Sequence, residues 1–326
     1  MNIIENIKEK ARLKNKTIVL PEYMDERVVK ACEIAVNEGI ANIILLGNID
    51  EIKKENRSVN LDNIKVIDPK TSELTENLIE KLANLRKIEK EQARELLLND
   101  YMYYACMLVK ENLADGVVSG ACHSSANTLR PALQIIKTKE NCELVSAFFL
   151  MDVPNKEYGY NGAFIFSDCG LNQNPNANEL ACIAIESAKS FKELVGAEPI
   201  VAMLSHSTKG SATHDDVNKV VEATKIAKKN SEFLLDGELQ LDAAIDKEVA
   251  KIKASDSFVA GRANVLIFPD LDAGNIGYKL VERLANAKAY GPITQGIKKP
   301  INDLSRGCNV DDIVGAIAIT VVQCED

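Results

Sequence analysis

The chain alternates between short apolar runs and longer stretches in which apolar residues recur at helical spacing. The runs lie at residues 17–20, 43–46, 64–67, 116–118, 200–204, 233–235 and 265–268. Most of them end in a polar turn, after which helical periodicity begins. Apolar strands that alternate with helices are typical of βαβ units around a parallel sheet. The pattern therefore predicts an α/β fold with polar loops at the ends of its strands.

In two further segments the spacing of apolar residues predicts secondary structure. Residues 72–113 have helical periodicity throughout, which predicts two helices rather than one. The basic cluster of residues 86–90 lies between these helices. Such a cluster is either a solvated surface or, through Arg86, part of a ligand site, and its spacing does not separate the two interpretations. Residues 158–166 alternate between polar and apolar side chains, which predicts a strand.

The length and composition predict two domains. A chain of 326 residues is long for one core and typical of two domains of about 150 residues each. With 46% hydrophobic residues and 27% charged residues, it has enough apolar surface for both cores. The composition of the sequence changes at residues 145–151, which are strongly apolar. We therefore expect a domain boundary close to residue 141.

Charge and cysteine usage exclude several classes of protein. The net charge of -9 argues against a nucleic-acid binder, so local Arg and Lys groups must hold any anionic ligand. The eight cysteines are scattered without a CxxC pair, as expected for reduced thiols in the cytosol. The first ten residues lack the apolar core of a signal peptide, and no uncharged apolar run reaches about 18 residues. We expect a cytoplasmic protein without a membrane segment.

Residues 119–131 form a dense polar stretch directly after an apolar run. Ser119, Gly120, Ser125 and Thr128 lie there, where a strand leads into a loop and then a helix. In an open parallel sheet, ligands bind beyond the carboxyl ends of the strands, where such loops supply N–H and hydroxyl donors. A plain helix cap explains the same residues equally well. Neither GxxxxGK[ST] nor GxGxxG is present, so a nucleotide cofactor bound by either motif is unsupported.

Residues 300–312 form a second polar stretch, read as a loop, and an apolar helix follows it. Asn309 and Asp312 have the spacing of a capping box, although Asp replaces the usual Glu or Gln. Ser305 and Arg306 lie just before this helix start. A helix N-terminus with a flanking Arg also attracts phosphate, and a carboxylate can accept a proton. Both interpretations, cap and catalytic site, are open at this point.

The histidines give no support for a metal centre or a hydrolase triad. His123, His206 and His214 do not have metal-ligand spacing. A GxSxG elbow is also missing from the sequence. We expect neither a metal site nor a serine hydrolase.

Several blocks together resemble the phosphate acetyltransferase (phosphotransacetylase) family, also called phosphate acetyl/butyryltransferases. The blocks are residues 119–124, 128–138, the loop around Asp168, residues 268–276, Gly291-Pro292 and residues 303–307. They cover essentially the whole chain in one order. Ser125 and Asn127 stand where the family more usually has Thr and Asp, which leaves the bonding of that loop open.

The resemblance implies an architecture and a set of substrates. The fold would consist of two three-layer α/β lobes with mostly parallel sheets, of the isocitrate/isopropylmalate dehydrogenase type, with an active-site cleft between them. Residues 142–294 would form the inserted lobe that mediates dimerisation, and residues 295–326 would return to complete the lobe of residues 1–141. The family also implies a homodimer that uses coenzyme A, acetyl phosphate and inorganic phosphate, without a tightly bound cofactor or a metal.

The resemblance assigns roles to individual residues. Asp312 matches the family's proposed base, Ser305 its hydroxyl donor and Arg306 its anion-binding arginine. Substrate-binding positions are matched by Arg86, Arg130, Ser119, Gly120, Ser125 and Thr128. In the direction that forms acetyl-CoA, a thiolate attacks the carbonyl of acetyl phosphate. Full proton transfer from a free thiol to an ordinary aspartate costs roughly 6 kcal/mol, so desolvation, a nearby Arg or a concerted proton transfer must offset this cost.

Three other functions compete with acetyl transfer. A phosphate butyryltransferase-like enzyme would share the chemistry and have a wider acyl pocket. A metal-dependent decarboxylating dehydrogenase would share the fold type and reduce a nicotinamide. A catalytically silent anion-binding protein would use Ser305 and Asp312 only to cap the helix.

Overall fold

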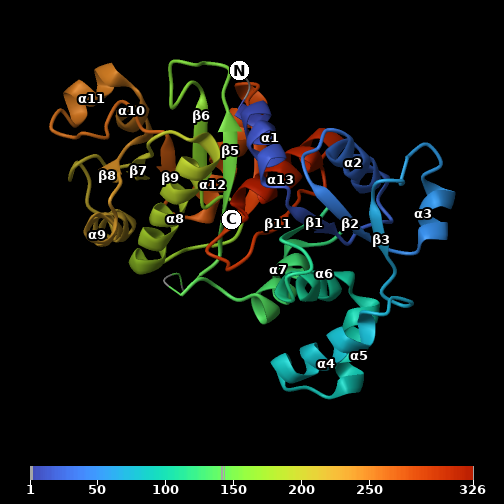
Figure 1. Ribbon diagram of the computed structural model, residues 1–326. Helices are drawn as coiled ribbons and strands as arrows, with labels where there is room; N and C mark the ends of the chain where they lie inside the picture. The colour runs from blue at the N-terminus through green and yellow to red at the C-terminus, as the bar shows by residue number, and fades with distance from the viewer. Residues whose placement is uncertain (1–2, 141, 143, 326) are drawn as a thin grey trace. The chain divides into compact units, whose positions relative to one another are not determined.

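In the described part of the chain, two β-sheets organise the fold, and each belongs to its own compact unit (Figure 1). The computed structural model describes residues 3–140, 142 and 144–325. The first unit comprises Ile4–Lys139 and Ile297–Asp326, and the second comprises Met1–Ile3 and Glu140–Gly296. The predicted fold of two α/β lobes with mostly parallel sheets is confirmed.

The sheet of the first unit has five strands in the order β11-β4-β1-β2-β3, and all its pairs are parallel. The strands are β1 (Thr17–Leu20), β2 (Asn42–Leu46), β3 (Lys65–Ile67), β4 (Gly116–Ser119) and β11 (Ile301–Asp303). Helices α2 (Glu26–Asn37) and α13 (Val310–Gln323) cover one face, and α6 (Tyr101–Lys110) and α7 (Ser125–Ile135) cover the other (Figure 1). The remaining helices α1 (Ile3–Lys14) and α3 (Ile49–Glu55) connect to this sheet along the chain.

Strand β11 corrects the interpretation of residues 300–312 as a loop. Ile301–Asp303 pair with β4 in parallel register. The buried Asn302 side chain donates to Thr320 Oγ1 at 2.8 Å and to Gln323 Oε1 at 2.7 Å on α13. Polar residues can occupy this strand because α13 supplies hydrogen-bond partners that are invisible in the local sequence.

The prediction of two helices over residues 72–113 is wrong, because the described structure has three. They are α4 (Thr75–Arg86), α5 (Lys90–Asn99) and α6. Lys87 ends α4 in the left-handed region with φ 55°. Asp100 separates α5 from α6 in an extended conformation and accepts a hydrogen bond from Met102 N at 3.0 Å. A single capping aspartate thus divides a continuous helical pattern.

The sheet of the second unit has six strands in the order β10-β5-β6-β9-β7-β8. The strands are β5 (Ser146–Asp152), β6 (Ala163–Ser167), β7 (Ile200–Leu204), β8 (Leu234–Leu239), β9 (Val265–Ile267) and β10 (Lys288–Gln295). The pairs of β5 with β10 and β6 are antiparallel, and the other pairs are parallel. The helices are α8 (Ala177–Val195), α9 (Asp215–Asn230), α10 (Leu241–Ile245), α11 (Lys247–Lys253) and α12 (Leu271–Leu284).

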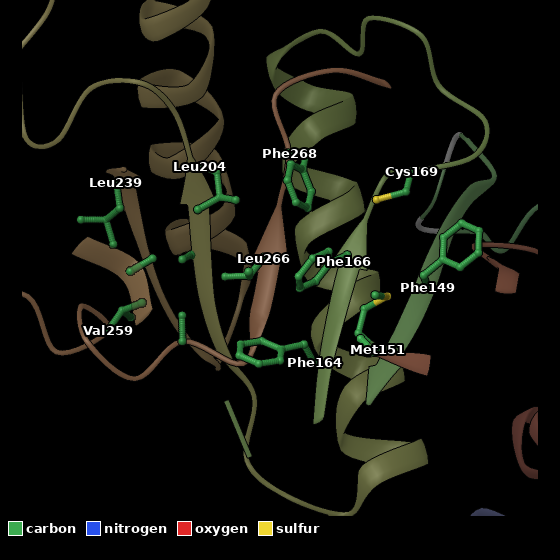
Figure 2. Close-up of a cluster of buried hydrophobic side chains, with 14 of the residues drawn as sticks. Phe149, Met151, Phe164, Phe166, Cys169, Leu204, Leu239, Val259, Leu266 and Phe268 are labelled. Carbon is green, nitrogen blue, oxygen red and sulfur yellow. The ribbon is translucent and has the colours of Figure 1, made fainter. Parts of the chain in front are cut away.

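The strand predicted at residues 158–166 is shorter in the structure. Only Ala163–Ser167 form β6, and Gly159 (φ +59°) and Gly162 (φ +85°) turn the chain before it. The side chains of β6 alternate across the sheet, so Phe164 and Phe166 enter one apolar cluster with Phe268 (Figure 2). The rings of Phe166 and Phe268 lie 5.4 Å apart. This cluster anchors one face of the second sheet.

None of the helices within the described residues combines the length and apolar character that a bilayer-spanning helix needs.

Candidate active site

The start of α13 holds the predicted base in a capping box. The Asn309 side chain accepts a hydrogen bond from Asp312 N at 3.0 Å, and Asp312 Oδ2 accepts one from Asn309 N at 2.9 Å. The predicted cap is therefore confirmed. Asp312 Oδ1 has no hydrogen bond within the described residues, so one oxygen of this half-buried carboxylate remains free to accept a proton.

The segment between β11 and α13 exposes the other predicted catalytic groups. Ser305, Arg306 and Gly307 are all exposed. Ser305 Oγ accepts a hydrogen bond from Gly307 N at 3.3 Å, which leaves its O–H free to donate. Within the described residues, the Arg306 guanidinium makes no hydrogen bond or ion pair. A hydroxyl donor and an unpaired guanidinium are thus presented on one short segment, hereafter the 303–312 segment.

Residues 119–128 carry most of the predicted binding residues. They comprise the end of β4, the loop after it and the first turn of α7, and are hereafter called the 119–128 loop. Gly120 has φ +113°, and a Cβ there would lie 2.6 Å from Leu304 N. Only glycine fits where this loop passes so close to the 303–312 segment. Helix α7 then begins at Ser125, with Ser124 at its N-cap.

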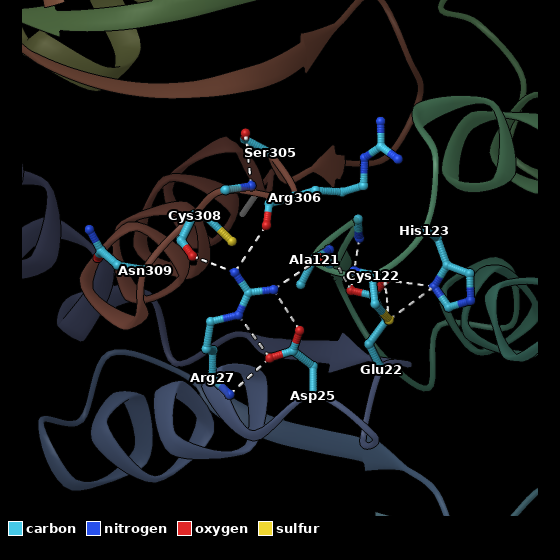
Figure 3. Close-up of polar contacts among 12 residues, drawn as sticks. Glu22, Asp25, Arg27, Ala121, Cys122, His123, Ser305, Arg306, Cys308 and Asn309 are labelled. Carbon is cyan, nitrogen blue, oxygen red and sulfur yellow. Dashed lines mark hydrogen bonds and ion pairs between the residues drawn. The ribbon is translucent and has the colours of Figure 1, made fainter. Parts of the chain in front are cut away.

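A buried carboxylate that the sequence analysis missed binds the backbone of the 119–128 loop. Glu22 follows β1 and is 1% exposed. Its Oε2 accepts hydrogen bonds from Gly120 N at 2.8 Å and Ala121 N at 2.9 Å, and its Oε1 accepts one from Cys122 N at 3.1 Å (Figure 3). These amides are therefore already used, and the loop can offer a ligand its hydroxyls but not these N–H groups.

Arg27 at the start of α2 joins the two polar segments and was also missed. Its Nη1 donates to Cys308 O at 2.6 Å and to Arg306 O at 3.0 Å, and its Nη2 donates to Ala121 O at 3.0 Å (Figure 3). Asp25 binds the same guanidinium at 2.6 Å. The hydrogen bond with Arg27 lowers the pKa of Asp25, so the pair stays charged.

Asp303, the last residue of β11, is a buried carboxyl beside the 119–128 loop. It is 2% exposed and accepts a hydrogen bond from Ser125 Oγ. Burial raises its pKa to about 6, against the lowering effect of the Ser125 hydrogen bond. Its Oδ1 and the buried Thr128 Oγ1 have no hydrogen-bond partner within the described residues. The two buried side chains lie close together, and Thr128 as well as Ser125 counteracts the rise in the Asp303 pKa.

A pocket of about 470 Å³ opens beside this loop in the first unit. It is lined by Pro21, Tyr23, Met24, Lys70, Leu98, Asn99, Asp100, Tyr101, Met102, Ser119, His123, Asn127 and Thr128. Ser119 and Thr128, two of the predicted binding residues, both line this cavity. Burial raises the pKa of Asp100 in the same wall.

The two predicted binding arginines have different surroundings. Arg86 is half-buried at the end of α4, and its Nη1 donates to Gln134 Oε1, which also accepts from the Tyr103 hydroxyl at 2.7 Å. Arg130 is exposed on α7 and has no side-chain hydrogen bond or ion pair within the described residues. Arg86 is therefore fixed in place, and Arg130 is a cation free to meet an anion.

The two aspartate loops of the second unit are structural. Asp168 is 2% exposed and accepts hydrogen bonds from Gly170 N at 2.7 Å, Leu171 N at 2.9 Å and Ala147 N at 3.2 Å. Asp270 is the N-cap of α12 and accepts one from Ala273 N at 2.8 Å. Both carboxylates bind the backbone around them and organise their own loops.

One cluster in the first unit has the donor atoms that a metal ion requires. Glu22, Cys122 and His123 each bring one such atom to within 4.8 Å of the others. Within the described residues, no other group of His, Cys, Asp and Glu side chains does so.

Comparisons with known proteins agree with one another. A family model described as phosphate acetyl/butaryl transferase matches residues 2–321. A phosphate acetyltransferase of Thermoanaerobacterium thermosaccharolyticum is 55% identical over 100% of both chains. The structure of a phosphotransacetylase from Streptococcus pyogenes superposes with a TM-score of 0.92 at 44% identity, covering 98% of this chain and 97% of that one.

A more distant solved structure shares only the fold. It is 4-hydroxythreonine-4-phosphate dehydrogenase from Klebsiella pneumoniae, with a TM-score of 0.54 at 12% identity, over 95% of this chain and 100% of that one. The dehydrogenase-like fold type predicted from the sequence is consistent with this likeness.

Proposed function

Because the chain belongs to the phosphate acetyl/butaryl transferase family, we propose that it transfers an acetyl group reversibly between coenzyme A and inorganic phosphate. The observation that carries this function is the 55% identity, over the full length of both chains, with a phosphate acetyltransferase. The family and the acyltransferase class predicted from the sequence are confirmed. The relatives also favour acetyl transfer over the butyryl alternative.

We propose that the 119–128 loop and its pocket bind substrate. Ser119 and Thr128 line the pocket, Gly120 lies where the chain passes close to Leu304, and the Ser125 hydroxyl donates to Asp303. The positions of Ser119 and Thr128 in the pocket lining support this assignment, because a few convergent polar groups are what orients a ligand in a pocket. Arg86 and Arg130 would bind phosphate groups of coenzyme A, acetyl phosphate or inorganic phosphate.

We propose that the 303–312 segment carries the chemistry. The sulfur of coenzyme A attacks the carbonyl carbon of acetyl phosphate, a C–S bond forms, the C–O bond to phosphate breaks and inorganic phosphate leaves. Asp312 Oδ1, free of the capping box, accepts the thiol proton. The Ser305 hydroxyl donates to the developing oxyanion, and Arg306 binds the phosphate that leaves.

Transfer of the thiol proton to Asp312 in concert with attack by the sulfur is compatible with the position of Asp312 in the helix cap. Asp312 keeps one hydrogen bond to the helix backbone, so it is oriented by the same cap that limits its basicity. A concerted transfer avoids the roughly 6 kcal/mol needed to form a free thiolate against an ordinary aspartate. Cap and base are therefore compatible roles of one side chain.

The first experiment is a thioester assay with the purified full chain. Coenzyme A and acetyl phosphate are mixed with the protein, and thioester formation is followed by absorbance, with propionyl and butyryl phosphate as alternative donors. We expect formation that depends on coenzyme A and is fastest with the acetyl donor. Absence of thioester would overturn the proposal, and a faster butyryl reaction would replace acetyl by butyryl transfer. Reduction of a nicotinamide with a divalent metal would indicate a dehydrogenase instead.

Three further properties remain proposals. We propose a homodimer formed through residues 142–294, a cytoplasmic location, and no tightly bound cofactor. Light scattering after size-exclusion chromatography tests the first, since the chain mass is 35.7 kDa and a dimer doubles it. A single species at the monomer mass at all concentrations would contradict it.

A further inference from the structure

A thiol sulfur and an imidazole nitrogen meet at one carboxylate oxygen beside the 119–128 loop. Glu22 Oε1 lies 2.7 Å from His123 Nδ1 and 3.3 Å from Cys122 Sγ, and these last two atoms are 3.5 Å apart (Figure 3). Figure 3 shows the Cys122 and His123 side chains turned toward Glu22 from the same loop. We propose that Glu22, Cys122 and His123 form a binding site for a divalent transition-metal ion, with Zn²⁺ as the best-fitting ion.

The separations of the donor atoms fit tetrahedral coordination. Zinc binds Cys S at about 2.3 Å, His N at about 2.0–2.1 Å and carboxylate O at about 2.0–2.2 Å. In a tetrahedron with these bond lengths, neighbouring donors lie about 3.3–3.6 Å apart. The Cys122–Glu22 and Cys122–His123 separations of 3.3 and 3.5 Å already match. The His123–Glu22 separation must lengthen by about 0.6 Å when an ion replaces the shared proton.

Backbone amides hold the Glu22 carboxylate in place, as is usual for a carboxylate that binds a metal ion. The amides of Gly120 and Ala121 bind its Oε2, and the amide of Cys122 binds its Oε1. Oε1 therefore keeps one lone pair, for which the Cys122 S–H and the His123 N–H now compete. A cation bound to Oε1, Sγ and Nδ1 together resolves this competition, and the amides hold the carboxylate in place.

The charges around the cluster favour a cation over a free thiolate. The carboxylate of Glu22 supplies a negative charge beside the Cys122 sulfur and the His123 ring nitrogen, so the cluster attracts a cation. A coordinated divalent ion supplies the positive charge that allows the thiolate to form, and the thiol proton is released to solvent. The neighbouring Arg27 and Asp25 form an ion pair with each other at 2.6 Å.

Two of the three ligands are open to solvent. Cys122 is exposed, the His123 side chain is 45% exposed, and His123 lines the pocket. An ion can therefore reach the Cys122 and His123 donors, which lie over the buried Glu22 oxygen, and water or an anionic group would complete the tetrahedron. The site lies in the 119–128 loop, which we propose binds substrate, but the acetyl-transfer chemistry itself needs no metal.

The experiment titrates the chelator-treated full chain with Zn²⁺ in competition with a chromophoric chelator. We expect one tight ion per chain, and we expect Cys122→Ser and His123→Ala each to weaken binding by at least 10-fold. Cys182→Ser is the matched control, because Cys142 and Cys182 place their sulfurs 2.8 Å apart and are an alternative thiol pair. Equal Zn²⁺ affinity in wild type, Cys122→Ser and His123→Ala would overturn the proposal.

The absorption spectrum of bound Co²⁺ shows whether a thiolate is one of its ligands. A cobalt ion bound by a thiolate has a near-ultraviolet charge-transfer band, which we expect in wild type and in Cys182→Ser but not in Cys122→Ser. Both substituted side chains of the proposed site are exposed, so the variants should fold, and circular dichroism checks this. A band that persists in Cys122→Ser and disappears in Cys182→Ser would place the ion at the other thiol pair and contradict the site.

Discussion

The 119–128 loop and the 303–312 segment leave neighbouring strands of one sheet, β4 and β11, but the structure holds them differently. The loop is bound from inside by Glu22, which is 1% exposed and accepts three backbone N–H groups. The segment is held mainly near its ends, where Asp303 pairs with β4 and Asn309 caps α13. Residues 305–307 in its middle are exposed, and Arg27 binds the carbonyls of Arg306 and of the buried Cys308.

This difference suits two different tasks. A loop fixed by a buried carboxylate can present binding groups in one geometry before the substrate arrives. The exposed segment presents the Arg306 guanidinium, the Ser305 hydroxyl and one oxygen of Asp312 without a hydrogen bond within the described residues. Such groups can act on the reacting atoms. We therefore expect variants of the 303–312 segment to change kcat and variants of the 119–128 loop to change substrate affinity.

Asp312→Asn is expected to have the largest effect. The amide oxygen can still accept from Asn309 N, so the cap remains while the base is lost. Loss of a general base typically costs 10²–10⁴-fold, and we expect about a 1,000-fold lower kcat. The control is Asp311→Asn, an exposed neighbour in the same turn. If Asp312→Asn kept near-full turnover with unchanged coenzyme A affinity, the carboxylate would be a cap only.

Asp303→Asn should change how stability depends on pH. Burial raises the Asp303 pKa from its ordinary value of 3.8 to about 6, so the folded state holds its proton more tightly than the unfolded state. The stability this group contributes is complete below pH 3.8 and is lost as pH rises through about 6. A shift of about two pKa units corresponds to about 3 kcal/mol.

Urea unfolding at pH 4 and pH 7 measures this effect. We expect the difference in unfolding free energy between wild type and Asp303→Asn to fall by about 2 kcal/mol from the lower to the higher pH, because part of the full effect is already lost at pH 4. Asp256→Asn, at an exposed position, is the control. A difference that stays constant between the two pH values would refute the assignment of a buried, proton-retaining carboxyl beside the 119–128 loop.

Arg306→Gln should weaken the reaction with acetyl phosphate next most strongly. The guanidinium is exposed and unpaired within the described residues, so its loss costs no internal contact. We expect kcat/KM for acetyl phosphate to fall about 100-fold, because Arg offers a bidentate, charged contact to phosphate. Arg57→Gln, another exposed arginine of the first unit, should leave kinetics unchanged. Wild-type kinetics in Arg306→Gln would move the anion site elsewhere.

Arg27→Gln should have the smallest effect of the four. The variant loses charged hydrogen bonds to the carbonyls of Ala121, Arg306 and Cys308, so it loosens the 303–312 segment without removing a reacting group. We expect kcat to fall about 10-fold with little change in KM, which a KM-against-kcat comparison measures. Arg94→Gln, which breaks a surface pair with Glu76, is the control. A rise in KM with normal kcat would contradict the division of tasks.

Sequence patterns were sufficient for the features that local residues determine. The apolar runs at residues 17–20, 43–46 and 116–118 correspond to strands of the first unit, and the capping box of Asn309 and Asp312 is present. These features depend on period and on spacing over a few residues, which the sequence contains directly.

Features that depend on contacts between distant residues were missed. Glu22 binds amides about 100 positions later in the chain, and Arg27 binds carbonyls 279 and 281 positions later. Strand β11 was read as a loop because the partners of Asn302 lie on α13. The nearest usable signal was the position of Glu22, directly after an apolar strand and at the edge where parallel strands place binding groups.

The most direct test of these separate tasks compares Asp312→Asn with Thr128→Val. Thr128→Val is nearly isosteric and removes only a hydroxyl that has no partner within the described residues. Calorimetric titration with coenzyme A and with acetyl phosphate is combined with single-turnover thioester formation. We expect Asp312→Asn to bind both substrates as wild type does and to lose turnover, and Thr128→Val to bind one of them about 10-fold more weakly and keep single-turnover chemistry. The reverse pattern, or equal losses of both quantities in both variants, would contradict the account.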